Sequence, residues 1–239
     1  MLLSSRVVSN DNFRHKNTTR FLYNKQLKAK NERSSCNLES SKHVLKEWSV
    51  VIGALLSGEQ NILFRKGGIK EPVFKPIAKK FLLFPTSFHS EQKLLKSHVE
   101  ASYPQELKFD PKAVDIIPVE AYAEVTGAWT TTDPSVVESL SSYHITTNAV
   151  LESRLKWKKK QPITILELRI FRLNKPISIP RQDSLFGCFS WVDLEDGITL
   201  TSKEISWAGT PVIDDATFEK KQKDLRKRLL TSQATEIVF

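Results

Sequence analysis

The chain has 239 residues, of which 40% are hydrophobic and 26% are charged, a composition that suits one good-sized folded domain or two small ones. No run approaches the roughly 20 apolar residues of a membrane-spanning helix, so we expect no membrane insertion. Two cysteines exclude a disulfide-built secreted scaffold, and the few glycines and prolines exclude a collagen-like or low-complexity chain. The net charge of +9 raises the question of a nucleic-acid ligand.

The positive charge lies at the two ends of the chain. Residues 1–42 hold nine Lys and Arg against three Asp and Glu, and residues 219–239 hold six against three. The part between them, 43–218, holds 21 of each and is neutral. Bulk charge therefore gives no reason to expect nucleic-acid binding by the body of the chain, and only local clusters of cations do.

Residues 1–42 form a basic leader that is rich in hydroxyl side chains, poor in acidic ones and free of Gly and Pro. It lacks the run of about 7–15 apolar residues that marks a secretory signal. This composition predicts a disordered organellar transit segment, with the chloroplast as the expected address and the mitochondrion as the alternative. We expect cleavage between Arg33 and Ser41. The other interpretation is a basic tail kept for an anionic partner.

The first half of the body predicts two strands and two helical segments. Helical spacing of apolar residues predicts one helix that ends at Gly58. These residues are Val44, Leu45, Trp48, Ile52, Leu55 and Leu56. Residues 61–66 predict a strand, and Gly67-Gly68 after it predicts a hairpin turn. Residues 81–84 predict a second short strand. Helix-compatible sequence follows to about Glu100, and 103–111 are expected to form a loop.

The second half predicts longer elements. Residues 116–126 and 163–173 alternate as strands do, and 187–194 and 204–207 predict further short strands. Asp133-Pro134 opens a helix, residues 146–157 form another, and Asp214-Asp215 caps a last one that reaches about Leu230. We therefore predict an α+β fold, a single domain with a mixed, largely antiparallel sheet packed by four to five helices. The predicted core domain is 43–213, followed by a basic helix and tail at 214–239.

Five short landmarks carry a resemblance to a known family. They are LKEW at 45–48, RKGGI at 65–69, FLLFPT at 81–86 with His89 just beyond, RLKWKKKQP at 154–162 and GCFSW at 187–191. Together they resemble the cyanobacterial and plant family known as domain of unknown function 1802, over most of 43–195. That family has no established activity, so the resemblance implies no catalytic residues and no cofactor. It does imply a plastid address.

Two groups of cations are candidates for binding an anionic ligand. Arg65 and Lys66 precede a Gly pair whose free N–H groups would help to cradle a phosphate, although a hairpin tip with exposed charges gives the same pattern. The second group surrounds Trp157 and consists of Arg154, Lys156, Lys158, Lys159 and Lys160. Cations with an interleaved aromatic ring suit single-stranded nucleic acid. The alternative is a solvated helix end with Trp157 packed inward.

Charged residues inside the strand 163–173 give a catalytic alternative. Glu167 and Arg169 share one strand face with apolar neighbours, and a structural ion pair between them, alone or with a cross-strand partner, is the simpler interpretation. The catalytic interpretation joins Glu167 to Glu120, Glu124 or Asp115 as Mg²⁺ ligands for phosphodiester cleavage.

The remaining reactive residues show no strong pattern. No histidine has metal-ligand spacing, although His89 is the best histidine candidate, and Cys188 is expected to be a small buried thiol.

Three functions follow from these patterns. The first is a plastid binding module for RNA or another polyanion, and the second is a metal-dependent hydrolase or nuclease. The third is an assembly protein that binds a protein partner through its last helix. The sequence identifies no cofactor and leaves open whether the protein is an enzyme.

Overall fold

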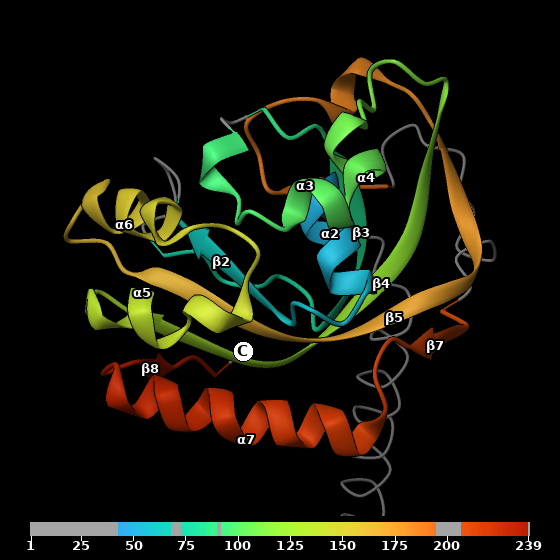
Figure 1. Cartoon of the computed structure of the whole chain (residues 1–239). Helices are drawn as coiled ribbons and strands as arrows, with labels where there is room; N and C mark the ends of the chain where they lie inside the picture. The colour runs from blue at the N-terminus through green and yellow to red at the C-terminus, as the bar shows by residue number, and fades with distance from the viewer. Residues whose placement is uncertain (1–42, 68–72, 90–91, 195–206, 239) are drawn as a thin grey trace, which may run out of the picture. The chain divides into compact units, whose positions relative to one another are not determined.

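Two long strands, β4 (Ile116–Thr131) and β5 (Ile163–Pro180), pair antiparallel along nearly their whole length. They belong to a computed structural model that describes residues 43–67, 73–89, 92–194 and 207–238 (Figure 1). Register shifts at Val119/Ala121 and at Val125/Gly127 interrupt the ladder, and such bulges increase bend and twist. The pair accordingly sweeps across the molecule in a long curve (Figure 1). A Cβ at Gly127 would collide with the ring of Trp129, so glycine at this bulge leaves room for that ring.

The other strands extend this pair into one sheet. They are β1 (His43–Trp48), β2 (Ile62–Lys66), β3 (Lys80–Thr86), β6 (Trp191–Asp193), β7 (Gly209–Pro211) and β8 (Thr235–Glu236). The order is β2-β5-β4-β3-β1-β6, with β7 added to β5 and β8 added to β4. Only β1 and β3 pair in parallel among the described strands. The predicted α+β fold with a mixed, largely antiparallel sheet is confirmed.

Six α-helices pack against this sheet in the described part of the chain, slightly more than the four to five predicted. They are α2 (Ser49–Leu56), α3 (Val99–Ser102), α4 (Pro104–Lys108), α5 (Ser135–Ser139), α6 (Asn148–Lys156) and α7 (Asp215–Thr231). The additional helix is α4, which begins at Pro104 inside the segment expected to be a loop. None of the helices seen here has both the length and the apolar character that crossing a bilayer requires.

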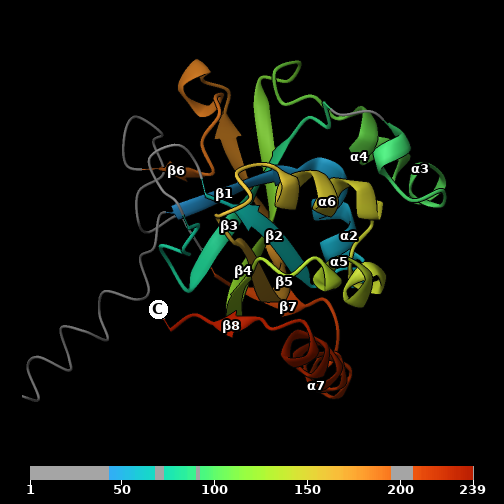
Figure 2. The ribbon, with the colours of Figure 1, turned by 90° about the vertical axis from the view of Figure 1, so that its left-hand side faces the viewer.

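The helices lie on both sides of the long strands. α7 runs below β4 and β5, and α2, α3 and α4 lie on the opposite side of these strands (Figures 1 and 2). Val50 and Leu55 of α2 join Leu166 and Leu168 of β5 in the core on that side. Leu225 of α7 belongs to a separate cluster with residues of α5 and α6. The sheet is therefore buried on both faces along much of its length, which favours near-continuous apolar runs over simple alternation.

The helix predicted over Val44–Leu56 is wrong in its first half. Residues 43–48 form strand β1, and only residues from Ser49 onward form α2. β1 lies between β3 and β6, and Val44, Leu45 and Lys46 are buried in succession, so burial in this strand does not alternate. Its apolar residues Val44, Leu45 and Trp48 combine with those of α2 to give helical spacing, which predicts a single helix. Gly58 follows the helix with φ of +77°, as expected for the residue that ends it.

The hairpin predicted at Gly67-Gly68 does not join the two strands that flank it. β2 pairs with β5, and β3 pairs with β1 and β4, so β2 and β3 lie at different places in the sheet. Of the predicted strand 187–194, only Trp191–Asp193 is extended and paired. The strand predicted over 204–207 falls almost entirely outside the described residues.

Candidate functional site

The two predicted groups of cations meet at one corner of the molecule, here called the basic corner. It consists of Arg65, Lys66, Arg154, Lys156, Trp157, Lys158, Lys159 and Lys160. β2 pairs with β5 so that Lys66 lies opposite Ile163, directly after the turn that follows α6. Lys66 Nζ donates to the Gln161 carbonyl at 2.6 Å, and Arg154 Nη1 donates to the Phe64 carbonyl at 2.5 Å. These bonds join the end of β2 to the end of α6, which lie side by side in both views (Figures 1 and 2).

The inner cations of the basic corner use their donors within the chain. Arg65 pairs with Glu47 at 3.1 Å and donates to the Lys46 carbonyl at 2.5 Å, with 15% of its side chain exposed. Burial lowers the pKa of Arg154, and the positive charge of Arg65 lowers it further while Glu47 opposes the shift. Burial also lowers the pKa of Lys66. The side chains of Arg65, Lys66 and Arg154 therefore have a structural role in the basic corner. Its exposed surface comes from the residues that follow Arg154.

The outer part of the basic corner consists of Lys156, Trp157, Lys158, Lys159 and Lys160. Trp157 ends α6 with 48% of its surface exposed, so the interpretation in which it packs inward is wrong. Lys158 has a φ of +46° and holds its Nζ 4.6 Å from the centroid of the Trp157 ring. The side chain of Lys156 is 72% exposed and pairs with Glu152 at 3.3 Å. The turn thus presents an aromatic ring surrounded by cations.

A buried histidine lies directly behind the inner cations. His144 is 3% exposed, and its Nδ1 lies 2.9 Å from the Thr146 hydroxyl, while its Nε2 has no hydrogen-bond partner among the residues that the structure describes. It shares a cavity of about 20 Å³, room for about one water molecule, with Glu47 and Arg154. Burial, with the charge of Lys96, lowers the pKa of His144 to about 4, so the ring is neutral at physiological pH. No local motif marks this position, and only the fold places it beside the corner.

The charged residues of β5 pair with α7 and not with each other. Glu167 is fully buried and accepts from Arg226 at 2.7 Å, Gln222 at 2.9 Å and the Thr126 hydroxyl at 2.8 Å. Arg169 pairs with Asp215 at 2.7 Å. The predicted pair between these strand neighbours is therefore wrong in its partners, because both side chains pair with residues of α7. All three hydrogen bonds to the Glu167 carboxylate go to Oε2, and Oε1 is buried without a partner among the described residues. The two strand charges act together to hold α7 on the sheet.

The other predicted carboxylates have separate partners. Glu124 pairs with Lys80 at 3.3 Å, Glu120 lies 3.7 Å from Arg172, and Asp115 lies 3.4 Å from Arg181. In the ranges that the structure describes, no three His, Cys, Asp or Glu side chains come together as a metal site. The structure thus gives the carboxylate hypothesis no assembled site. Cys188 is exposed, so the expectation of a buried thiol is wrong.

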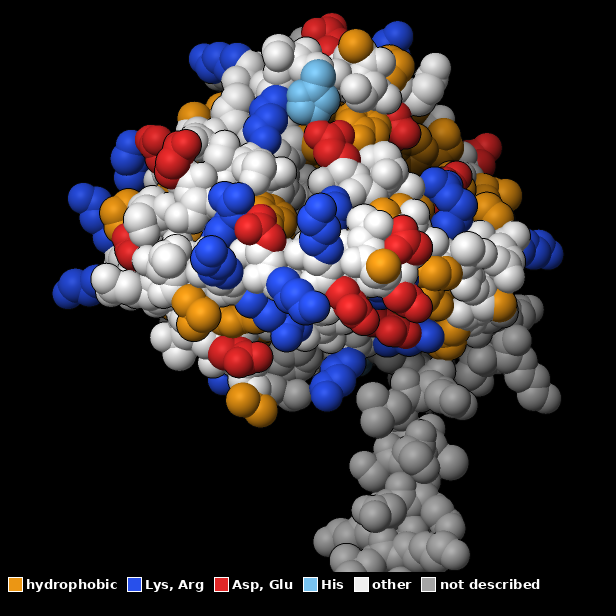
Figure 3. Space-filling model, turned by 60° about the horizontal axis from the view of Figure 1, so that its bottom comes forward, with side chains coloured by type: hydrophobic (Ala, Val, Ile, Leu, Met, Phe, Trp, Pro, Cys, Tyr) orange, Lys and Arg blue, Asp and Glu red, His pale blue; other side chains and the backbone are white. Residues whose placement is uncertain are grey.

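The last helix uses its own apolar side chains inside the domain. Phe218, Leu225 and Leu229 of α7 are buried, and the helix N-terminus is capped by Asp214, which accepts from Thr217 N at 2.9 Å. Figure 3 looks onto the side on which α7 lies and shows Lys and Arg side chains beside Asp and Glu side chains. The helix therefore presents mixed charge outward and has its apolar face covered.

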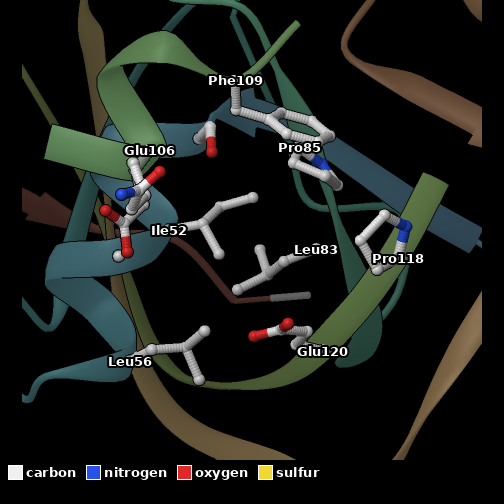
Figure 4. A pocket seen from close by; sticks show the side chains of 11 residues that line it. Ile52, Leu56, Leu83, Pro85, Glu106, Phe109, Pro118 and Glu120 are labelled. Carbon is white, nitrogen blue, oxygen red and sulfur yellow. The ribbon is translucent and has the colours of Figure 1, made fainter. Parts of the chain in front are cut away.

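A pocket of about 190 Å³ lies between α2, α4, β3 and β4, and no sequence pattern predicts it. Its apolar wall comes from Ile52, Leu56, Leu83, Pro85, Phe109 and Pro118. Glu106 on α4 and Glu120 on β4 face this space from opposite walls (Figure 4). The lining residues come from four elements that are distant in sequence, so no single stretch carries a recognisable pattern. We call this space the acceptor pocket.

Comparisons with known proteins place the chain in a family and give no activity. No curated protein matches the sequence. The structure is similar to the ASCH protein from Zymomonas mobilis, with 13% identity and a TM-score of 0.36, over 64% of this chain and 87% of that one. A single-residue variant of that protein gives 14% identity and a TM-score of 0.34, over 66% and 91% of the two chains. The sequence pattern of one family matches residues 44–224, which confirms the resemblance seen in the sequence landmarks. The chain belongs to the family described as domain of unknown function (DUF1802).

Proposed function

We propose that this protein is a non-catalytic binding module for single-stranded RNA and that the outer part of the basic corner contacts the ligand. One observation carries the proposal: Trp157 is half exposed at the end of α6 and has the Lys158 cation held against its ring. Lys159 and Lys160 follow it on the surface, and Lys156 precedes it. Every base has an aromatic face that can stack on such a ring, and each phosphate can pair with a neighbouring cation.

The inner cations act in this proposal by holding the corner in place. Arg154 ties α6 to β2, and Lys66 ties β2 to the turn before β5. The turn carrying Trp157 is therefore fixed at both sides. A fixed turn loses less conformational entropy when a ligand orders its side chains, so it favours binding.

A substitution of the exposed ring tests the proposal. We expect Trp157→Ala to weaken binding of a fluorescent single-stranded RNA by about 5- to 150-fold, since stacking contributes roughly 1–3 kcal/mol per base. Fluorescence anisotropy with the full-length chain measures the dissociation constant.

Phe189→Ala is the matched control for that experiment. Phe189 is 44% exposed and has the Lys46 Nζ 4.2 Å from its ring centroid, so it repeats the same kind of pair outside the basic corner. We expect this variant to bind as the wild type does. Equal affinity of the Trp157 variant and the wild type would reject the proposed contact surface.

The proposed setting of this function is the chloroplast. The acid-poor, basic composition of residues 1–42 supports this address, and the mitochondrion is the alternative. Fusion of residues 1–42 to a fluorescent protein tests the proposal by microscopy in plant cells. We expect plastid fluorescence, and a cytosolic signal would contradict it.

A further inference from the structure

The acceptor pocket combines an apolar wall with hydrogen-bond acceptors that no side chain of the described chain satisfies fully. Glu106 is half-buried and makes no ion pair or side-chain hydrogen bond within the described residues. Ser49 is 7% exposed, and its hydroxyl likewise has no partner in the described ranges. Ser49 lines the cavity, so its hydroxyl is placed to meet a ligand there.

Apart from the Gln105 amide and the Ser49 hydroxyl, which can donate as well as accept, the polar side chains that line the pocket are carboxylates. Pro85 and Pro118 on its wall lack an N–H, and both carboxylates are acceptors only when ionised. Glu120 and Glu106 lie on opposite walls, so a group placed between them meets negative charge from both sides (Figure 4). Such a site disfavours anions and favours a group that carries several N–H donors.

The charge balance around the pocket points to a single positive charge. Arg172 Nη1 lies 3.7 Å from the Glu120 carboxylate, and Arg172 Nη2 donates to the Leu56 carbonyl at 3.3 Å. This guanidinium offsets one of the two carboxylates and leaves about one negative charge uncompensated. A monocation would restore neutrality.

The size and lining of the pocket limit the rest of the ligand. A volume of about 190 Å³ is below the roughly 300–1,000 Å³ of sites for drug-sized molecules, so the occupant is small. Ile52, Leu56 and Leu83 contribute aliphatic surface, and Phe109 contributes a ring. These surfaces fit a compact apolar body.

We propose that the acceptor pocket binds a small organic ammonium ion, with the charged nitrogen between Glu106 and Glu120 and the apolar body against Ile52, Leu83 and Phe109. The Ser49 hydroxyl supplies a further acceptor. The pocket shares no residue with the basic corner, so this proposal stands independently of RNA binding.

Three probes with the same apolar body test the proposal on the full-length wild-type protein. They are phenethylammonium, the neutral 2-phenylethanol and the anionic phenylacetate, each titrated by isothermal calorimetry. We expect phenethylammonium to bind at least about tenfold more tightly than the alcohol, because hydrogen bonds to charged groups are the stronger kind. We expect phenylacetate to be excluded. Equal binding of all three probes, or no binding of the ammonium ion, would overturn the proposal.

Variants of the two glutamates then test whether their carboxylates bind the ammonium group. Glu106→Gln and Glu120→Gln keep the shape of the side chains, and each is expected to weaken phenethylammonium binding by roughly tenfold or more. Glu100→Gln, on the exposed surface of α3, is the matched control and should bind as the wild type does. Thermal melting of each variant verifies that it is folded. An affinity unchanged in both folded pocket variants would place the ion elsewhere and reject the site.

Discussion

At the scale of single residues, the imidazole of His144 links the interior to the basic corner. Its ring packs edge-on against Phe64 at a centroid distance of 5.2 Å, and Arg154 donates to the carbonyl of that same Phe64. The positive charges of Lys96 and Arg154 reinforce the effect of burial, and the interaction with Thr146 opposes it. A proton added to this ring would bring a further charge into a buried region that already holds cations. Protonation of His144 therefore opposes folding.

The stability of the protein should fall in mild acid because of this residue. The pKa of His144 is about 4 in the folded state against 6.5 for an ordinary histidine, so the unfolded state binds more protons between these values. The neutral His144 ring contributes fully to the free energy of unfolding above pH 6.5. This contribution, about 3 kcal/mol, is lost as the pH falls toward 4. Urea unfolding at a series of pH values measures this loss.

The variant His144→Asn isolates the contribution. Asparagine does not titrate in this range, so the difference in unfolding free energy between wild type and variant should change steadily from pH 6.5 to 4. A difference that stays constant over this range would show that His144 is not buried in its neutral form.

At the scale of elements, α7 is held on the sheet by both apolar and charged contacts. Leu225 has none of its surface exposed, and Arg226 beside it reaches the buried carboxylate of Glu167. Arg169 lies with its guanidinium carbon 4.6 Å from the ring centroid of Phe218 and also pairs with Asp215. The helix therefore completes the face of β4 and β5 that would otherwise leave these charges without partners.

Removal of the central apolar contact of α7 should destabilise the whole domain. We expect Leu225→Ala to lower the free energy of unfolding by about 2–5 kcal/mol, the usual cost of a cavity at a buried leucine. Leu230→Ala on the same helix is the control, because Leu230 is 79% exposed and should change stability by less than about 0.5 kcal/mol. Chemical denaturation of both variants makes the comparison. Similar small losses in the two variants would mean that α7 is not packed on the sheet.

How far the sequence predicts these elements depends on burial. The alternation in β4 and the cap of α7 at Asp214 are local signals, and both elements form where they were expected. The sequence predicts a helix in place of β1 because burial in this strand does not alternate, and because Val44, Leu45 and Trp48 extend the helical spacing of α2.

The two candidate sites differ in the same way, since one is encoded by a local sequence pattern and the other only by the fold. Trp157 and the lysines around it are adjacent in sequence and were predicted as a group. The carboxylates Glu106 and Glu120 line one pocket only because the fold places α4 and β4 around the same space, which no local pattern encodes.

At the scale of the whole molecule, the +9 net charge is distributed so that it does not by itself support the proposed RNA binding. The span 43–218 is neutral, and α7 adds cations that are mixed with acidic side chains on its outer face (Figure 3). The proposed binding by the body of the protein therefore depends on a local cluster in which cations outnumber carboxylates. The turn from Lys156 to Lys160 is such a place, with four lysines in five residues, of which Lys156 pairs with Glu152.

The salt dependence of RNA binding tests this account most directly. Each phosphate that a protein neutralises on a single strand contributes about −0.7 to the slope of log affinity against log salt concentration. The triple variant Lys156→Ala, Lys159→Ala, Lys160→Ala should therefore reduce the magnitude of the slope by about 2. The control is a second triple variant on α7 that removes the same charge, Lys220→Ala, Lys223→Ala, Lys227→Ala. Both triple variants retain residues 1–42. The slope of the control variant should differ from that of the wild type by less than about 0.5. A slope that falls equally in both triples, or in neither, would contradict the assignment of RNA binding to the basic corner.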